Sequence, residues 1–217
     1  MLQANQRKFH PPAVVTLLLA AVLALRAMPA GAGDTATPEA AVEAAVARIM
    51  ETVRAERAAL EADPTRVRRL LDESISPYID FEGMSQLVLG RYWRSASAEQ
   101  RQRFIDAFRN FLVRFYASAV EEFIIRQGLP EELSIVLLPS PPSEDNRSAR
   151  VKTAIQQQGG QPIAVDYTLY RRGDTWRVVD IQVGGISLVV SYRQSFAGEI
   201  RNLGLDGLIE QLAAAGA

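Results

Sequence analysis

Beyond its N-terminal segment, the chain has a helical hydrophobic pattern up to residue 128 and an alternating pattern afterwards. The longest helical pattern runs from Ala98 to Gln127, where apolar residues form one stripe and most polar residues lie opposite it. Ser97 and Gln100 form a capping-box signal at its start, and Gly128 is a typical stop signal. The pattern predicts a helix about 45 Å long. Its stripe consists of Phe104, Phe108, Phe111, Leu112, Phe115, Ala119 and Phe123.

Shorter helices are predicted before this one. Thr37 is a suitable cap for a helix over residues 38–62, which begins with proline and continues with an apolar stripe. Asp63 is a cap for a second helix, and a third short helix is expected near residues 84–89, ended by Gly90. These helices all present an apolar side, so they need partner surfaces elsewhere in the chain.

After residue 128 the apolar positions alternate, which is typical of strands with one buried face. Four consecutive strands joined by short turns favour an antiparallel meander that packs its apolar face on helices. Two helices should follow the sheet, one from Leu188 that Gly204 ends and one around residues 208–212. The predicted fold class is α+β, with an antiparallel four-stranded sheet packed against several helices. The predicted strands are Leu133–Leu138, Ala149–Gln156, Ile163–Tyr170 and Trp176–Val183.

The N-terminus has the features of a secretory signal peptide over residues 1–32. Arg7 and Lys8 precede an apolar run over residues 13–25, which is too short to span a bilayer. Small residues around Ala30 and Ala32 form a cleavage pattern before Gly33. An uncleaved anchor is the alternative. We expect cleavage, which leaves residues 33–217 as a single domain, and no cysteine is present to carry a lipoprotein anchor.

Composition then narrows the possible functions. Removal of Arg7, Lys8 and Arg26 leaves 21 basic residues against 25 acidic ones, a net charge of −4. A mildly acidic domain argues against nucleic acid as a partner. The sequence has no cysteine, and its single histidine, His10, lies in the predicted signal peptide. These absences exclude nucleophilic triads that need histidine or cysteine, and zinc sites built on imidazole or thiolate.

The remaining polar candidates give no catalytic set. Asp166 and Asp180 lie in strands at positions that should face away from the apolar side, so surface or ion-pair roles are expected, and a buried general base is the alternative. Phosphate-binding glycine motifs are missing, and Gly184–Gly185 is interpreted as a strand-to-helix hinge. We predict no catalytic residue, metal site or cofactor. The unexplained feature is a large apolar surface; periodicity alone favours an ordinary closed core, and a lipid cavity, which gives the same pattern, is the alternative.

Several segments resemble the MlaC family, periplasmic toluene-tolerance or phospholipid-binding proteins of Gram-negative bacteria. The similarity spans nearly the whole chain after the signal peptide. Its first block ends near Ala117 and its second begins at Trp176. The segments that carry it are Asp80–Phe81, Leu89–Arg94, Ala98–Arg101, Phe104, Phe108, Leu112, Tyr116–Ala117, Trp176–Ile181, Gly185–Val189, Tyr192–Arg193 and Gly204–Leu208.

The resemblance implies a curved sheet and helices that enclose an apolar cavity for phospholipid acyl chains. It also implies a periplasmic carrier that moves lipid between an outer-membrane lipoprotein complex and an inner-membrane ABC transporter with its periplasmic substrate-binding subunit, which would maintain outer-membrane lipid asymmetry. A hopanoid or another lipid is an alternative cargo. A protein-binding adaptor with a closed core is a further alternative, and a cavity of several hundred Å³ would exclude it.

Inward-facing positions supply the candidate cavity residues. They come from the long helix, the third and fourth strands and the start of the next helix. The predicted lipid-binding residues are Phe108, Phe111, Leu112, Phe115, Val165, Tyr167, Leu169, Val179, Ile181, Val183, Ile186 and Val189.

Overall fold

The computed structural model describes most of the chain beyond the N-terminal segment. The predicted signal peptide and the glycine turn at 159–160 lie outside the described residues, as does Leu133, so those predictions stay untested. Among the residues that are described, no helix is long and apolar enough to cross a membrane. The described residues are 37–128, 134–141, 143, 146–156 and 161–216.

The element order confirms the α+β prediction. Helices precede an antiparallel sheet of consecutive strands, and a long helical segment follows it. The sheet contains a fifth strand that the sequence did not indicate, β5 (Ile186–Ser187), which pairs with the end of β4. The elements before the sheet are α2 (Pro38–Ala62), η3 (Pro64–Arg66), α3 (Val67–Ser74), η4 (Ser76–Tyr78), α4 (Phe81–Leu89), α5 (Arg91–Ser95) and α6 (Ala98–Gln127). The others are β1 (Ser134–Leu138), β2 (Ser148–Gln156), β3 (Ile163–Arg172), β4 (Thr175–Val183), β5 and α7 (Leu188–Gly216).

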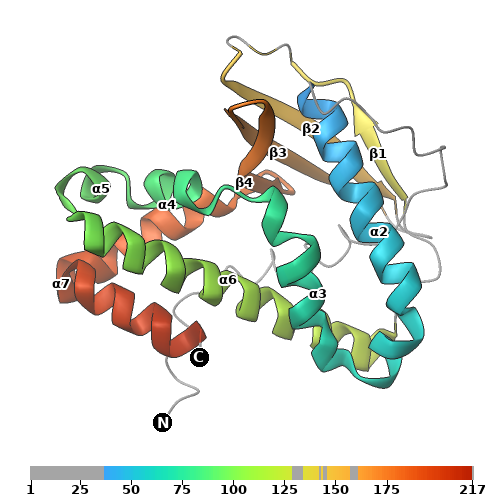
Figure 1. The fold of residues 1–217 in the computed structure, drawn as a ribbon, viewed down its shortest axis with the longest axis horizontal. Helices are drawn as coiled ribbons and strands as arrows, with labels where there is room; N and C mark the ends of the chain where they lie inside the picture. The colour runs from blue at the N-terminus through green and yellow to red at the C-terminus, as the bar shows by residue number, and fades with distance from the viewer. Residues whose placement is uncertain (1–36, 129–133, 142, 144–145, 157–160, 217) are drawn as a thin grey trace.

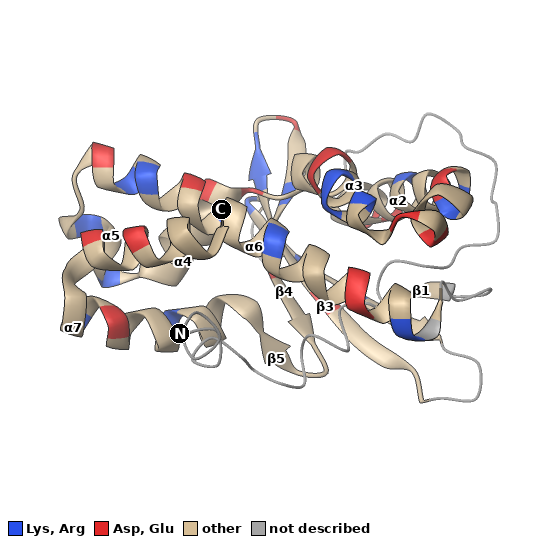
Figure 2. Ribbon diagram, turned by 90° about the horizontal axis from the view of Figure 1, so that it is seen from below, with Lys and Arg blue, Asp and Glu red and all other residues tan. Residues whose placement is uncertain are grey.

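Two layers are visible in the ribbon. Helix α2 crosses one face of the sheet, whereas α4, α5, α6 and α7 form a helical layer beside it, and α3 lies between α2 and α6 (Figure 1). Acidic and basic residues are interspersed on α2 and α3, so neither helix carries a surface of a single sign (Figure 2). The apolar side chains of the helices and the sheet pack together in the interior.

The interior consists of two hydrophobic clusters. The first, here called the sheet core, joins α2, α3, the end of α6 and the sheet, and includes Val46, Leu71 and Val165. The second, the helical core, joins α4, α5, the first half of α6 and α7, and includes Phe108 and Phe196. Helix α6 contributes buried residues to both clusters, and Ile79 and Ile181 also pack against both, so these residues connect the two cores.

The caps and stops read from the sequence account for the position of α6. The Ser97 hydroxyl accepts from the Gln100 backbone N–H at 3.1 Å, and the Gln100 side chain accepts from the Ser97 N–H at 3.1 Å. Gly128 ends the helix with a φ of 73°, a conformation that glycine adopts at little cost. Both predicted boundaries of the long helix are confirmed. Gly204, also with a φ of 73°, divides α7 into the two predicted segments.

A β-bulge changes which side chains of β4 face the helices. Leu169 of β3 pairs with Val178, whereas its neighbour Thr168 pairs with Asp180, so Val179 has no residue opposite it. Side chains alternate along a strand, and an extra residue shifts that alternation by one position. Trp176 and Val178 before the bulge therefore share a face with the odd-numbered residues after it.

Asp80 connects the helical layer to the sheet. Its carboxylate accepts from the Gly83 N–H at 2.8 Å and caps α4. The Nε and an Nη of Arg172 both lie 2.6 Å from Oδ2 of the same carboxylate. The Asp80 N–H also donates to the Val178 carbonyl at 2.9 Å. A Cβ on Gly83 would lie 2.5 Å from Asp80 Oδ2, so only glycine fits beside this carboxylate.

We expect Asp80→Ala to lower the free energy of unfolding by about 2–3 kcal/mol, because it removes a helix cap and leaves Arg172 without its carboxylate. Asp80→Asn keeps a cap acceptor and should cost about 1 kcal/mol. Urea denaturation monitored by circular dichroism measures both. Asp174→Ala is the matched control, since its 4.0 Å contact with Arg171 is solvent-exposed and should contribute less than about 0.5 kcal/mol. Equal losses for Asp80→Ala and Asp174→Ala would contradict the role of Asp80.

Candidate functional site

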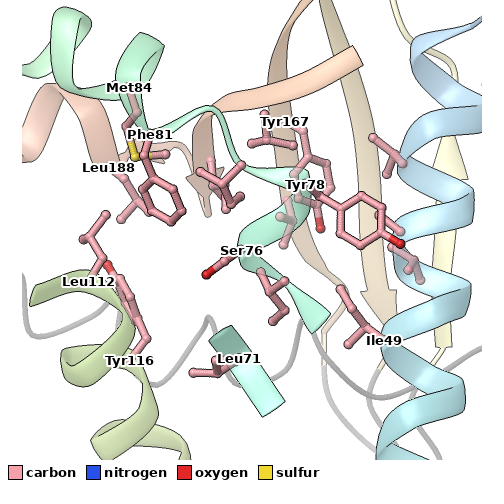
Figure 3. A pocket seen from close by; sticks show the side chains of 18 of the residues that line it. Ile49, Leu71, Ser76, Tyr78, Phe81, Met84, Leu112, Tyr116, Tyr167 and Leu188 are labelled. Atoms are coloured by element: carbon pink, nitrogen blue, oxygen red, sulfur yellow. The ribbon is translucent and has the colours of Figure 1, made fainter. Parts of the chain in front are cut away.

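An apolar cavity of about 200 Å³ lies where the sheet core and the helical core meet. Its lining includes Val46 and Val165 from the sheet core, and Met84 and Leu188 from the helical core. Figure 3 shows these two sides, with Phe81, Met84, Leu112, Tyr116 and Leu188 facing Ile49, Tyr78 and Tyr167 across the space. We call this boundary the seam.

The cavity wall comes from eight elements, α2, α3, η4, α4, α6, β3, β4 and α7, and from the segments that join them. Helix α6 contributes a stripe one turn long on either side of Tyr116, at the point where it passes from one core to the other. The lining from the first part of the chain is Ala41, Val42, Ala45, Val46, Ile49, Leu71, Ile75, Ser76, Tyr78, Ile79, Phe81 and Met84. The remaining lining is Leu112, Val113, Tyr116, Ala119, Val120, Val165, Tyr167, Leu169, Trp176, Val178, Ile181 and Leu188.

The chemistry of the wall is almost entirely hydrocarbon. No Asp, Glu, Lys or Arg side chain lines the cavity within the described part of the chain. The side-chain oxygens in the lining belong to Ser76, Tyr78, Tyr116 and Tyr167. Ser76 donates to Asp72 at 3.2 Å, outside the wall. Such a lining favours an apolar ligand and disfavours an ion, because an isolated charge there would lose its hydration without compensation.

The buried tyrosines are strongly perturbed. Burial raises the pKa of Tyr167 from its ordinary value of 10.0 to about 12, and a hydrogen bond with Thr153 opposes that rise. Burial likewise raises the pKa of Tyr192 to about 12, against an interaction with Tyr116. The pKa of Tyr116 itself is raised well above 10.0 by burial and by Tyr192. All three phenols are therefore neutral hydrogen-bonding groups at any physiological pH.

Five of the predicted lipid-binding residues lie in the cavity wall. Leu112 is contributed by α6, and Val165, Tyr167 and Leu169 are contributed by alternate positions of β3. Ile181 is contributed by β4 after the bulge. The period-2 pattern of β3 was therefore a good guide to its inward face.

The predicted phenylalanines of α6 lie in the helical core instead of the wall. The Phe108 ring is fully buried and contacts Tyr192 of α7 edge-on, with 5.5 Å between centroids. Phe111 contacts Tyr192 at 5.9 Å and stacks on Phe115 at 5.8 Å. Edge-to-face aromatic packing of this kind stabilises a helix pair. These side chains hold α7 against α6, and any part they take in lipid binding stays a prediction.

The last four predicted residues are also outside the wall. Val179 is the bulge residue, fully buried, and a Cβ on Gly83 would lie 2.9 Å from its Cγ1, so it packs on α4. Val183 is buried in the sheet core, and Val189 in the helical core. Ile186 lies in β5 and is 39% exposed. Lipid contact by these four residues is likewise untested.

Much of the wall was missed from the sequence, including the seven lining residues between Leu71 and Met84. Helix α2 supplies five lining residues, although its apolar stripe was recognised, because the pattern does not show what an apolar side covers. Trp176 and Val178 were missed because strict alternation put Val179 inside, and the bulge reverses that order. A bulge of this kind leaves little signal in a single sequence.

The strand carboxylates are outside the cavity wall. Asp180 accepts from the Ser187 hydroxyl at 2.6 Å and from the Val189 N–H at 3.0 Å, so it caps the start of α7. Asp166 lies opposite Lys152 in the register of β2 and β3. Neither is in the lining, so the described part of the cavity lacks the buried general base that was the alternative for these two residues.

A comparison with protein families identifies the fold family. A model of the MlaC protein family matches residues 43–214. The chain belongs to the MlaC family. The MlaC match covers every residue that lines the cavity except Ala41 and Val42. The resemblance recognised in the sequence is thereby confirmed.

Individual relatives agree with this assignment. The chain is 25% identical, over 92% of its length and 89% of the relative's, to the intermembrane phospholipid transport system binding protein MlaC of Haemophilus influenzae. It is 26% identical, over 78% of its length and 76% of the relative's, to the toluene tolerance protein ttg2D of Pseudomonas putida. A phospholipid-binding protein from Ralstonia solanacearum, solved in complex with a phospholipid, has a TM-score of 0.70 and 28% identity, covering 82% of this chain and 96% of that one.

The tyrosine environments give a prediction for pH titration. Tyr167 and Tyr192 should stay neutral in the folded protein to about pH 12, and burial also raises the pKa of Tyr116 well above 10.0, so absorbance at 295 nm should show a late step as the pH approaches 12. Because their folded pKa values exceed the unfolded value of 10.0, the folded state keeps more protons above pH 10. Stability should therefore fall as pH rises from about 10 towards 12.

Tyr167→Phe is the control for this titration, since it should remove one tyrosine from the late step only. A single step near pH 10 in protein that circular dichroism shows to be folded would contradict the burial of these phenols.

Proposed function

We propose that this chain is a phospholipid-binding carrier that shuttles lipid between the two membranes of a Gram-negative envelope. The observation that carries the proposal is an uncharged cavity at the seam of a chain in the MlaC family. The names of its relatives, and the phospholipid bound by the Ralstonia protein, support the same cargo class. The role needs no catalytic residue, and we propose that the protein is not an enzyme.

The physical requirement for such a carrier is to shelter acyl chains from water. Exposure of each CH₂ costs about 0.8 kcal/mol, so a lipid crosses an aqueous space only within an apolar enclosure. The wall of the cavity is apolar on the side of α2, on the side of α6 at Leu112, and on the side of the sheet at Ile181. It supplies no charge for a headgroup, so the headgroup is expected to remain in water at the mouth.

The cavity must widen to hold a whole lipid. Ligand pockets are commonly about 300–1,000 Å³, and a volume of about 200 Å³ is below the several hundred Å³ that would exclude a closed core. The wall belongs to two separately packed cores, so widening needs a small shift of α2 and the sheet away from the helical layer, and neither core has to be disrupted. A closed-core adaptor is the competing function, and it predicts that no lipid is retained.

Location and partners form part of this proposal. The predicted signal peptide would direct the protein to the periplasm. There the partners would be an outer-membrane lipoprotein complex and an inner-membrane ABC transporter with its periplasmic substrate-binding subunit. The name of the Haemophilus relative, which describes an intermembrane transport system, supports this arrangement. A hopanoid would need the same apolar shelter and remains an alternative cargo that lipid analysis separates from phospholipid.

Cavity filling tests the proposal. Ala45 on α2 lines the cavity, and we expect Ala45→Trp to reduce co-purified lipid at least about fivefold, because the indole would occupy the space of the chains. Ala44→Trp is the matched control, since Ala44 is the adjacent exposed residue of the same helix. Native mass spectrometry and lipid analysis of protein purified from a Gram-negative host measure the bound fraction.

Two results would overturn the proposal. Repeated recovery of lipid-free wild-type protein would favour the closed-core adaptor. Equal lipid content in Ala45→Trp and Ala44→Trp, with both variants folded, would place any lipid elsewhere than this cavity.

A further inference from the structure

A cationic side chain lies beside the cavity, just outside its wall. Arg109 of α6 is one helical turn before Leu112 and Val113, which line the cavity. Its guanidinium carbon lies 5.8 Å from the centre of the Phe81 ring, which is another lining side chain. The Arg109 side chain is 40% exposed. Arg109 therefore lies between the hydrocarbon lining and the solvent.

Asp72 of α3 holds this guanidinium from a second direction. Its Oδ1 accepts from Nη2 of Arg109 at 2.5 Å and from the Ser76 hydroxyl at 3.2 Å. Ser76 lines the cavity, and Figure 3 shows it pointing toward the side of the space that carries Phe81 and Leu112. Arg109, Asp72, Ser76 and Phe81 are thus joined at one edge of the cavity, and we call this group the Arg109 rim.

The contacts of the Arg109 rim leave most of the guanidinium edge unused. A guanidinium carries several N–H donors in a planar fork. Within the described part of the chain, Arg109 makes one hydrogen bond, to Asp72, while its contact with Phe81 uses the face of the group. An ion pair this exposed contributes little to stability, so stability alone does not account for its place beside the cavity. The other N–H groups can bind an anion there.

A phosphodiester is the anion that suits both the guanidinium and the cavity. Two N–H groups of one fork match two oxygens of a phosphate. In a phospholipid the phosphate is attached through glycerol to the acyl chains, so chains inside the cavity place the phosphate at its edge. Inside the apolar wall the phosphate would lose its hydration without compensation, whereas at the rim it stays in contact with water and gains a cation.

We propose that the Arg109 rim is the headgroup subsite of the cavity, in which free N–H groups of Arg109 donate to the phosphate oxygens of the cargo. Arg109 is the specificity residue. Asp72 is a positioning residue, because its carboxylate orients the guanidinium over Phe81. This inference rests on the proposed carrier function and adds recognition of the phosphate to it. A lipid with the same chains and no phosphate gains nothing from Arg109.

The test compares two lipids that have equal chains and differ in the phosphate. Dioctanoyl phosphatidylglycerol and dioctanoylglycerol are titrated against the delipidated mature protein by displacement of Nile red, an uncharged fluorescent probe. Arg109→Gln should weaken phosphatidylglycerol binding about tenfold, the effect of a charge-assisted hydrogen bond, and diacylglycerol binding by less than about twofold. Arg103→Gln is the matched control. Arg103 forms an exposed ion pair with Asp206 on the same helix and is absent from the lining, so both affinities should stay at the wild-type values.

Asp72→Asn separates phosphate recognition from a structural role of the ion pair. Asparagine keeps an oxygen that accepts from Arg109 and removes the negative charge beside the phosphate. Phosphatidylglycerol affinity should therefore rise about twofold in this variant. If the pair served only to hold α3 on α6, Asp72→Asn and Arg109→Gln would instead weaken the binding of both lipids together.

The outcomes separate this inference from the carrier function. Equal weakening of both lipids in Arg109→Gln would overturn the headgroup subsite, and so would a loss of phosphatidylglycerol affinity in Asp72→Asn. Excess inorganic phosphate, compared with chloride at equal ionic strength, should leave the difference between wild type and Arg109→Gln in place, because the chains hold the headgroup at the rim. Loss of that difference would assign Arg109 to free phosphate and overturn the subsite. Failure of the wild type to bind either lipid would overturn the proposed function.

Discussion

The structure depends on one long helix that takes part in two separate cores. Phenylalanines in the first half of α6 pack against α7, whereas Ala117 and Ile124 further along belong to the cluster under the sheet. Ile79, Tyr116 and Ile181 pack against both clusters, so the two cores touch at these residues but do not close over the whole boundary. The cavity is the space left at their boundary, and Tyr116 lies in α6 at the point where the change occurs.

The same constraint explains why the apolar residues of α6 divide into two groups with different roles. Phe104, Phe108 and Phe111 face α7 and make a rigid aromatic contact. Leu112, Tyr116 and Val120, on the neighbouring stripe, face the space between the cores. A wide apolar stripe is thus two surfaces side by side, one that packs permanently and one that a ligand can cover. This division fits a carrier, in which the scaffold must stay folded while the cargo leaves.

Element boundaries followed from local signals in the sequence, whereas the cavity wall did not. The capping box at Ser97, the proline after Thr37 and the stop at Gly128 act within one turn of helix, so the bounds of α2 and α6 could be predicted. Which side chains line the cavity depends on contacts between elements that are far apart in the sequence. The shift at Val179 and the short strand β5 arise from pairing with β3 and β4, and no local pattern reports them.

The position of the cavity between two cores links loading to folding. A lipid chain held there touches residues of both clusters and acts as a removable part of the hydrophobic interior. Since it binds the folded state alone, mass action adds RT ln(1 + [L]/Kd) to the free energy of unfolding. The empty carrier is then less stable and more sensitive to proteases than the loaded one. The protein is in this less stable form from the moment it releases its lipid at a membrane until it binds another.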